Sequence, residues 1–396
     1  MRSFAIHIIL LFAISCTTPV KTDAGGDFPY DLLGDRDSLL VTDPGGRTLF
    51  SKNPETPLIP ASTLKVLTSL VALHYLREDH RFITEFYMDR KNNLKIKGYG
   101  DPFLISETLQ KIAGELCGKV NAAEAIILDD SYFLKPIDIP GVTDSFEPYD
   151  APNGALCANF NTVSFKREKG GYVSAEPQTP LLPFVLDRIR HFKSKEGRIL
   201  LSSRQNETTI YFGNLMQYFL WEKGVRTNGK IELGRVDETK DRLILRYISE
   251  LSLKDVISEL LKFSNNFVAN QLLLSAGVRA HGAPGTLEKG IDAALSYSRQ
   301  VLCTETIRIA EGSGISRENR ISALDMHRVL NRFKPYRLLM PVNNGEFYKT
   351  GTLSNVSTRV GYLEHQPDQV FSFIVFLNTP GKTADGVMKK LHARLH

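Results

Sequence analysis

Strand-like segments near both ends of the chain, with helices between them, constrain its fold more than any other feature. Alternating hydrophobic residues predict strands at 38–42, 48–50, 346–354, 356–363 and 370–378. Helical periodicity predicts helices from about residue 61, over 253–273, 287–301, 323–333 and 382–395. The outline is a two-strand start, a helical middle and a three-strand end.

The pattern changes between about residues 81 and 243. Short strand-like pieces are expected at 82–88, 94–97, 125–128 and 208–212, and helices at 106–117 and 214–223. We therefore expect a discontinuous domain of residues 27–78 and 244–396, with residues 79–243 inserted into it. The predicted fold class is α+β, an antiparallel sheet flanked by helices, carrying an inserted α+β or β-rich module.

The N-terminal residues predict an exported protein. The first residues carry a positive charge and are followed by an apolar run over 4–14. This run is too short to span a bilayer, and its length is typical of a signal peptide, which we expect over residues 1–25. Small residues before Cys16 resemble a bacterial lipoprotein cleavage site, although Ala13 stands where such sites usually carry Leu. Lipidation of Cys16, and with it a lipid anchor to a membrane, stays an open alternative. The expected location is the periplasm or cell envelope.

Charge and cysteine usage exclude several classes of protein. Lys and Arg number 49 against 44 Asp and Glu, with the two signs interspersed, so nucleic acid is not an expected partner. No C-x-x-C or H-E-x-x-H motif occurs, so neither a metal site nor a cofactor is predicted. Apart from Cys16, the chain has Cys117, Cys157 and Cys303, which allow at most one disulfide.

The first of three chemical motifs is Ser62-Thr63-Leu64-Lys65, at the predicted start of a helix. The i, i+3 spacing puts Ser62 and Lys65 on one helical face, within reach of each other. A serine hydroxyl needs a base to act as a nucleophile, and a lysine serves if desolvation lowers its pKa.

The second motif is Ser264-Asn265-Asn266, which we expect in the middle of a helix over 263–273. Polar side chains that interrupt an apolar helix indicate a functional role. The Ser264 hydroxyl can shuttle a proton, and the Asn266 amide can fix a lysine and a substrate amide.

The third motif is Lys349-Thr350-Gly351-Thr352, on a predicted edge strand. Gly351 lets a substrate backbone approach, and the strand edge can pair with an extended peptide. Lys349 supplies positive charge, and Thr350 and Thr352 supply hydroxyls, for a carboxylate.

Each motif alone carries little weight. A Ser-x-x-Lys or a Ser-x-Asn is expected by chance on the order of once in a chain this long, usually as a surface pair or a helix cap. Their order and placement together are similar to those of serine β-lactamases and penicillin-binding proteins.

Four further segments point to one family within this group of proteins. These segments are residues 53–65, 100–104, 129–133 and 311–320. With them the chain resembles the class C low-molecular-mass penicillin-binding proteins, which are D-alanyl-D-alanine carboxypeptidases and endopeptidases, over about residues 38–378. In that family extra domains stand between the first two motifs, and here Ser62 and Ser264 are 202 positions apart.

The resemblance implies roles for individual residues. Ser62 would be the acylated nucleophile, Lys65 its base, and Ser264 and Asn266 the proton relay and substrate holder. Lys349, Thr350, Gly351 and Thr352 would receive the terminal carboxylate, and the backbone N–H groups of Ser62 and Thr352 would form the oxyanion hole. Arg317 matches a family position implicated in recognising the free end of the peptidoglycan side chain. Asp144, Glu147 and Asp150 are candidates for an acidic partner from the insertion, and Asn270 stands where relatives often have an acidic residue.

The resemblance favours a serine-type D-Ala-D-Ala carboxypeptidase, with or without endopeptidase activity, that acts on peptidoglycan stem peptides. β-Lactams would inhibit it covalently. Two alternatives stay open. A β-lactamase is disfavoured by the long insertion, and a non-catalytic penicillin-binding or peptidoglycan-binding protein is disfavoured by three intact motifs.

Overall fold

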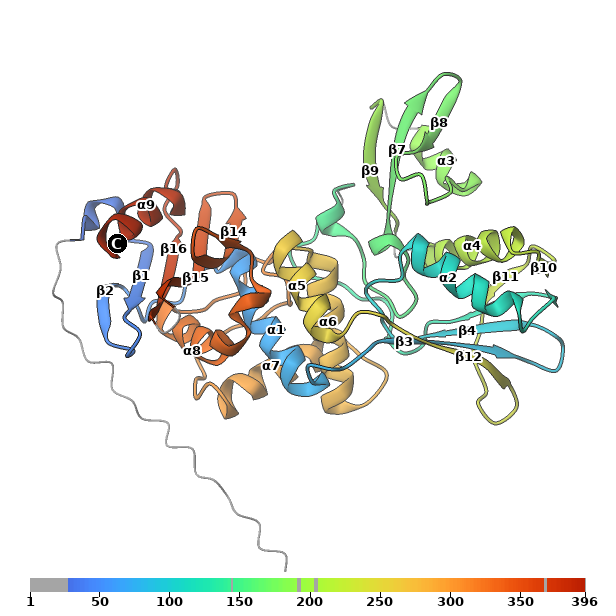
Figure 1. Ribbon diagram of the computed structural model, residues 1–396, viewed down its shortest axis with the longest axis horizontal. Coiled ribbons are helices and arrows are strands. Elements are labelled where there is room, and N and C mark those ends of the chain that lie inside the picture. Colours follow the sequence, from blue (N-terminus) through green and yellow to red (C-terminus); the bar gives the residue numbers. More distant parts are fainter. Residues whose placement is uncertain (1–27, 144, 191–193, 203–205, 367–368, 396) are drawn as a thin grey trace, which may run out of the picture.

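The computed structural model describes residues 28–143, 145–190, 194–202, 206–366 and 369–395. The predicted leader, Cys16 and Asp144 lie outside these residues. Two main sheets, each with its own helices and hydrophobic core, lie side by side along the long axis of the molecule (Figure 1).

The first sheet is antiparallel and combines strands from both ends of the chain. In spatial order its strands are β13 (Val342–Asn343), β14 (Glu346–Leu353), β15 (Val356–Gln366), β16 (Gln369–Leu377), β1 (Asp37–Thr42) and β2 (Thr48–Lys52). Every residue of β1 is buried. Leu39 and Val41 belong to one hydrophobic core and Leu40 to another, so both faces of the sheet are covered.

Helices cover the two faces. One face packs against α9 (Ala384–Leu395), through Val387, Met388 and Leu391. The larger core on the other face is built from α1 (Lys65–Leu76), α5 (Leu253–Phe263), α6 (Asn266–His281), α7 (Leu287–Gln300) and α8 (Ala323–Phe333). Ser252 caps the N-terminus of α5, because its side chain accepts from the backbone N–H of Asp255 in a capping box.

The second sheet is mixed and lies in the middle of the sequence. Its spatial order is β11 (Ile231–Leu233), β6 (Ile126–Asp129), β4 (Leu94–Gly98), β3 (Ile83–Met88) and β12 (Arg242–Ile248). The helices α2 (Ser106–Cys117) and α4 (Glu207–Glu222) pack into its core. A short parallel pair joins β5 (Ala122–Ala123) to β10 (Arg226–Thr227).

A small three-stranded sheet projects from this part (Figure 1). It consists of β8 (Gly171–Ser174), β7 (Thr162–Glu168) and β9 (Glu196–Leu200), with α3 (Pro183–Arg190) beside it. Short 3₁₀ turns include η2 (Ala61–Leu64), η3 (Pro148–Asp150) and η4 (Asn159–Asn161).

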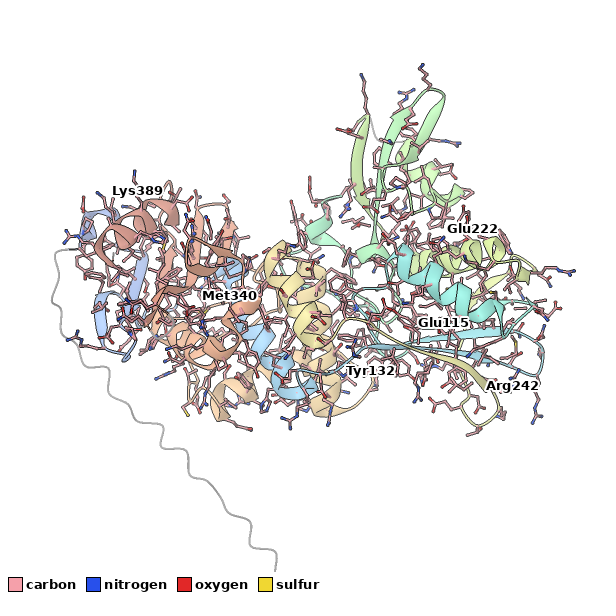
Figure 2. The ribbon with its side chains drawn as sticks, viewed as in Figure 1. Glu115, Tyr132, Glu222, Arg242, Met340 and Lys389 are labelled. Atoms are coloured by element: carbon pink, nitrogen blue, oxygen red, sulfur yellow. The ribbon has the colours of Figure 1, made fainter. Side chains whose placement is uncertain are left out.

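One buried side chain fastens the middle segment to α6. The amide nitrogen of Gln271 donates to the carbonyl oxygens of Gly100 (3.1 Å) and Gly154 (3.0 Å). Its amide oxygen accepts from Asn153 and from the Gly154 N–H. A small hydrophobic cluster around Phe133 and Val278 lies between the same segments, with Tyr132 beside it (Figure 2).

The predicted α+β class, with an antiparallel sheet flanked by helices, is confirmed. The strand predicted at 208–212 is wrong, because these residues open α4. The β-branched pair Thr208-Thr209 favours a strand locally, but the helix buries both, together with Tyr211 and Phe212. Cys117 and Cys157 are free thiols, so no disulfide joins Cys117, Cys157 and Cys303 to one another. Within the described residues, no helix is long and apolar enough to cross a membrane.

Replacing Gln271 by Leu tests the role of this contact. The variant leaves backbone groups of Gly100 and Gly154 buried without partners, so we expect the free energy of unfolding to fall by about 2–4 kcal/mol. Urea denaturation measures this change. A loss below about 0.5 kcal/mol, the usual effect of a surface substitution, would show that the amide does not fasten the two parts together.

Candidate active site

The nucleophile candidate Ser62 lies in the 3₁₀ turn η2, which leads directly into α1. The sequence predicted helical structure from about Ala61, and the first turn is the tighter 3₁₀ form. Ala61 has a left-handed backbone, with φ of 47°. Two glycines make room for this turn. A Cβ atom on Gly314 would lie 1.9 Å from the Ala61 carbonyl oxygen, and one on Gly351 would lie 2.7 Å from the Ser62 nitrogen.

The Lys65 side chain is fully buried, and its amine is held by three hydrogen bonds. Nζ lies 2.9 Å from Ser62 Oγ, 2.8 Å from Asn266 Oδ1 and 2.7 Å from the Ser313 carbonyl oxygen. The amide and carbonyl oxygens can only accept. A neutral amine has two N–H groups and one lone pair. Both N–H groups are therefore committed to these acceptors, and the lone pair is left to face the Ser62 hydroxyl.

Burial also favours the neutral amine. Desolvation holds the pKa of Lys65 well below its usual 10.5, and the nearby charge of Lys349 lowers it further. The carboxylate of Glu311 acts in the opposite direction and raises the pKa. The protonation of Lys65 is thus set by its surroundings.

Glu311 organises the loop that supplies the Ser313 carbonyl, and sequence reasoning gave it no individual role. Its carboxylate is fully buried and accepts from the Ser313 N–H (2.6 Å), the Ser313 hydroxyl (2.6 Å) and the Gly314 N–H (2.7 Å). Asn319 and Asn270 donate to it through their amide nitrogens. The Asn270 amide oxygen in turn accepts from the Gly312 N–H at 2.7 Å. An amide at position 270 therefore fits here, since it donates to Glu311 where an acid would repel it.

The second motif does not lie in the middle of a helix, as predicted, but at a break between two. α5 ends at Phe263, Ser264 has a left-handed φ of 55°, and α6 begins at Asn266. The Asn265 side chain caps α6 by accepting from the Val268 N–H. The break puts Asn266 in the first turn of α6, where its oxygen accepts from Lys65 and its nitrogen donates to the Tyr149 carbonyl oxygen at 3.2 Å.

The third motif lies on β14, beside η2. β13 pairs only with Glu346 and Phe347, so the outer edge of the motif is not paired with another strand of the described residues. Lys349 and Gly351 are buried and Thr350 is exposed, as expected from the alternation of side chains along a strand. Burial lowers the pKa of Lys349 to about 8.

The structure brings together Ser62, Lys65 and Asn266 by direct hydrogen bonds, with Lys349 close enough to lower the pKa of Lys65. The exposed Thr352 follows Gly351 on β14, and Ser264 stands next to Asn266 across the helix break. Arg317 is exposed and donates to the Ser354 carbonyl oxygen, just beyond the end of β14.

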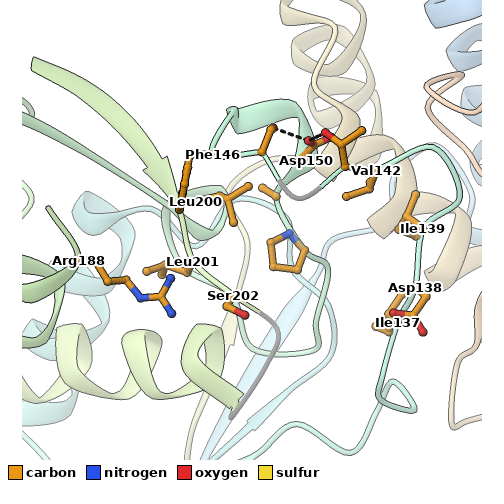
Figure 3. A pocket seen from close by; sticks show the side chains of 14 residues that line it. Ile137, Asp138, Ile139, Val142, Phe146, Asp150, Arg188, Leu200, Leu201 and Ser202 are labelled. Carbon is orange, nitrogen blue, oxygen red and sulfur yellow. Dashed lines mark hydrogen bonds between the residues drawn. The ribbon is translucent and has the colours of Figure 1, made fainter. Parts of the chain in front are cut away.

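The two acidic candidates of the insertion that the structure describes, Glu147 and Asp150, form no hydrogen bond or ion pair with the described motif residues. Glu147 is exposed, and Asp150 is buried, accepting from the hydroxyls of Thr143 (2.7 Å) and Ser145. Asp150 lines a cavity of about 660 Å³, with Arg188 on its opposite side (Figure 3). No motif residue lines that cavity. Among the described residues, no group of three or more His, Cys, Asp or Glu side chains is placed to hold a metal ion.

The chain is similar to known D-alanyl-D-alanine carboxypeptidases. The profile of the D-Ala-D-Ala carboxypeptidase 3 (S13) family matches residues 33–187 and 193–337. A D-alanyl-D-alanine carboxypeptidase from Actinomadura sp. is 24% identical, over 77% of this chain and 68% of that protein. The D-alanyl-D-alanine carboxypeptidase DacB from Haemophilus influenzae is 23% identical, over 82% of this chain and 81% of that protein.

The fold is similar to that of a solved structure. The crystal structure of penicillin binding protein 4 (dacB) from Haemophilus influenzae superposes with a TM-score of 0.72 and 20% identity, over 88% of this chain and 92% of that one. A second structure of that protein, in complex with a β-lactam, gives a TM-score of 0.68.

Replacing Glu311 by Ala tests whether this carboxylate organises the loop under Lys65. Several buried donors lose their acceptor, so we expect the free energy of unfolding to fall by at least about 3 kcal/mol. Glu318→Ala, an exposed glutamate in the same segment, is the control and should change it by no more than about 0.5 kcal/mol. Equal unfolding midpoints for both variants in urea would contradict this role.

Proposed function

Because the chain belongs to the D-Ala-D-Ala carboxypeptidase 3 (S13) family, we propose that it is a serine-type D-Ala-D-Ala carboxypeptidase acting through an acyl-enzyme. The observation that carries this proposal is the buried amine of Lys65, held between two fixed acceptors and the Ser62 hydroxyl. The substrate class is peptidoglycan stem peptides ending in D-Ala-D-Ala, and DD-endopeptidase activity on cross-linked stems is a further part of the proposal.

Acylation begins with proton transfer. The lone pair of Lys65 takes the Ser62 proton as Ser62 Oγ attacks the carbonyl carbon of the penultimate D-Ala. The backbone N–H groups of Ser62 and Thr352 stabilise the oxyanion. As the intermediate collapses, the C–N bond breaks, and the proton reaches the leaving D-Ala nitrogen from Lys65 through the Ser264 hydroxyl. Water then attacks the ester carbonyl carbon and gives a proton to Lys65, which passes it to Ser62 Oγ as the C–O bond to Ser62 breaks and the shortened peptide leaves.

The other motif residues hold the substrate. The ammonium group of Lys349, with the hydroxyls of Thr350 and Thr352, receives the terminal carboxylate. Gly351 leaves space for the peptide backbone beside β14, and Asn266 fixes the substrate amide while it holds Lys65 in place. Arg317, bonded to the carbonyl oxygen of Ser354, is proposed to contact the free end of the stem peptide.

A peptidoglycan substrate also suggests where the protein acts in the cell, and the motif positions suggest how its domains are arranged. We propose that residues 1–25 direct export to the periplasm or cell envelope, with or without lipidation of Cys16. We also propose that residues 27–78 and 244–396 form the catalytic domain and that residues 79–243 are an insertion.

β-Lactams present a reactive amide to Ser62, so they should acylate it.

A labelled penicillin tests the nucleophile. The wild-type protein should form a covalent adduct of one label per chain, and Ser62→Ala should form none, because the attacking oxygen is gone. Ser296→Ala, which removes a hydroxyl on α7, should label like the wild type. Intact-protein mass spectrometry measures the adduct. Labelling of Ser62→Ala would disprove the assignment, and rapid turnover of the penicillin would favour the β-lactamase alternative.

The two lysines predict a bell-shaped pH profile for kcat/KM on a D-Ala-D-Ala pentapeptide. The rate rises as Lys65 becomes neutral, at a pH below its usual pKa of 10.5, and falls near pH 8 as Lys349 loses its charge. In Lys349→Arg the charge persists, so the alkaline limb should vanish up to about pH 10. An unchanged limb near pH 8 in that variant would assign it to another group.

A further inference from the structure

A groove of about 590 Å³ opens next to the second motif and extends beyond the residues that the mechanism uses. It is lined by Ser264, Asn265 and Asn266 and by the aromatic residues Phe103, Tyr149, Phe160 and Phe263, among others. Its volume is within the range of about 300–1,000 Å³ that is typical of ligand-binding clefts. Because Asn266 belongs both to this groove and to the hydrogen bonds around Lys65, the groove is continuous with the catalytic residues.

Two of the aromatic side chains that line the groove are highly exposed to solvent. Phe263, the last residue of α5, is 66% exposed, and Tyr149 is 51% exposed. Phe263 is the most exposed aromatic side chain among the described residues. Large apolar side chains in a shared cleft are costly to leave in water, so their position indicates a ligand with an apolar face.

A third aromatic side chain of the groove, Phe160, lies in a segment with a left-handed backbone. Asn159, Phe160 and Asn161 all have left-handed φ values, of 49°, 56° and 55°. Such strain persists only where the surroundings enforce it. The Asn159 amide donates to Ser106 Oγ (2.9 Å), and the Asn161 amide to the Pro152 carbonyl oxygen (2.7 Å). Phe160 itself packs edge-on against Phe103 at 5.4 Å between ring centroids. The ring is therefore fixed in place before any ligand arrives.

The groove also holds polar groups that have no other partner. The Ser264 hydroxyl, the Asn265 amide nitrogen and the Glu259 carboxylate form no hydrogen bond or ion pair within the described residues. One other charged side chain, Arg198, lines the groove and is paired with Glu176. An apolar ligand would leave these groups unsatisfied, and an anionic one would meet the unpaired Glu259 carboxylate.

These properties suit a neutral sugar, whose ring has an apolar face and whose edge carries hydroxyl and acetamido groups. We propose that this groove binds the N-acetylated glycan to which the stem peptide is attached, so that the enzyme recognises sugar and peptide together. The inference rests on the proposed function, because the stem peptide held at Asn266 carries the sugar at its far end. About four residues, on the order of 13 Å when extended, separate the scissile bond from the sugar, which would therefore lie toward Glu259 and Phe263 on α5. Phe263, Tyr149 and Phe160 would pack against the rings, and Glu259 and Asn265 would form hydrogen bonds with their polar edges.

Two substrates of identical peptide sequence test the proposal. One is the free D-Ala-D-Ala pentapeptide, and the other is the same pentapeptide on an N-acetylglucosaminyl-N-acetylmuramic acid disaccharide. The wild-type kcat/KM should favour the disaccharide form by at least about tenfold. Phe263→Ser and, separately, Glu259→Gln should each reduce that ratio by about two- to tenfold, the loss expected for one aromatic or hydrogen-bonded contact.

Trp221→Ser is the matched control, since it removes an aromatic ring that is 50% exposed but lies in α4, outside the groove. It should leave the ratio unchanged. The proposal would be overturned by equal kcat/KM values for both substrates in the wild type, or by groove variants that lose the same fraction of kcat/KM on both substrates. A cross-linked peptide dimer serves as a third substrate. If the groove variants lose kcat/KM only on that dimer, the groove binds a second stem peptide and the proposal is wrong. If penicillin labels Ser62 in all variants, any such failure concerns the groove and not the proposed peptidase activity.

Discussion

The interaction on which the site depends is the burial of the Lys65 amine. A charged ammonium group is costly to bury, so this position favours a neutral amine, and a neutral amine with two fixed acceptors has one lone pair to offer to Ser62. Each acceptor comes from a different segment of the chain. Asn266 begins α6, and Ser313 lies in the loop that Glu311 organises. The amine can therefore act as a base only when the folded chain brings these segments together.

The rest of the architecture maintains this arrangement. The antiparallel sheet joins the two ends of the chain and brings Gly351 of β14 against the Ser62 turn. The break between α5 and α6 turns Asn266 toward Lys65, and Gln271, further along α6, holds the middle segment by its buried amide. The middle segment contributes directly as well, because the Tyr149 carbonyl oxygen fixes the orientation of the Asn266 amide. It also supplies most of the aromatic wall of the groove beside the second motif.

Sequence patterns predicted the terminal strands, most helices and the contact between Ser62 and Lys65, because these depend on periodicity and on neighbours one helical turn apart. They did not predict the Ser313 carbonyl as an acceptor, since a backbone oxygen has no signature in the sequence. The helix break was also missed, because Ser264 adopts a left-handed conformation that usually belongs to Gly or Asn. At Thr208-Thr209 the packing of α4 overrides local strand preference. In each case tertiary contacts, and not local propensity, decide the outcome.

The proposed mechanism requires Lys65 to be neutral at the pH where the enzyme works. The most direct measurement is an NMR titration of lysine labelled with ¹³C at Cε, with the Lys65 signal assigned by its absence from a Lys65→Met variant. We expect the Lys65 signal to titrate well below the ordinary lysine value of 10.5, because the amine is buried. A Lys65 signal that titrates at the ordinary value would show that the buried amine is charged and cannot take the Ser62 proton.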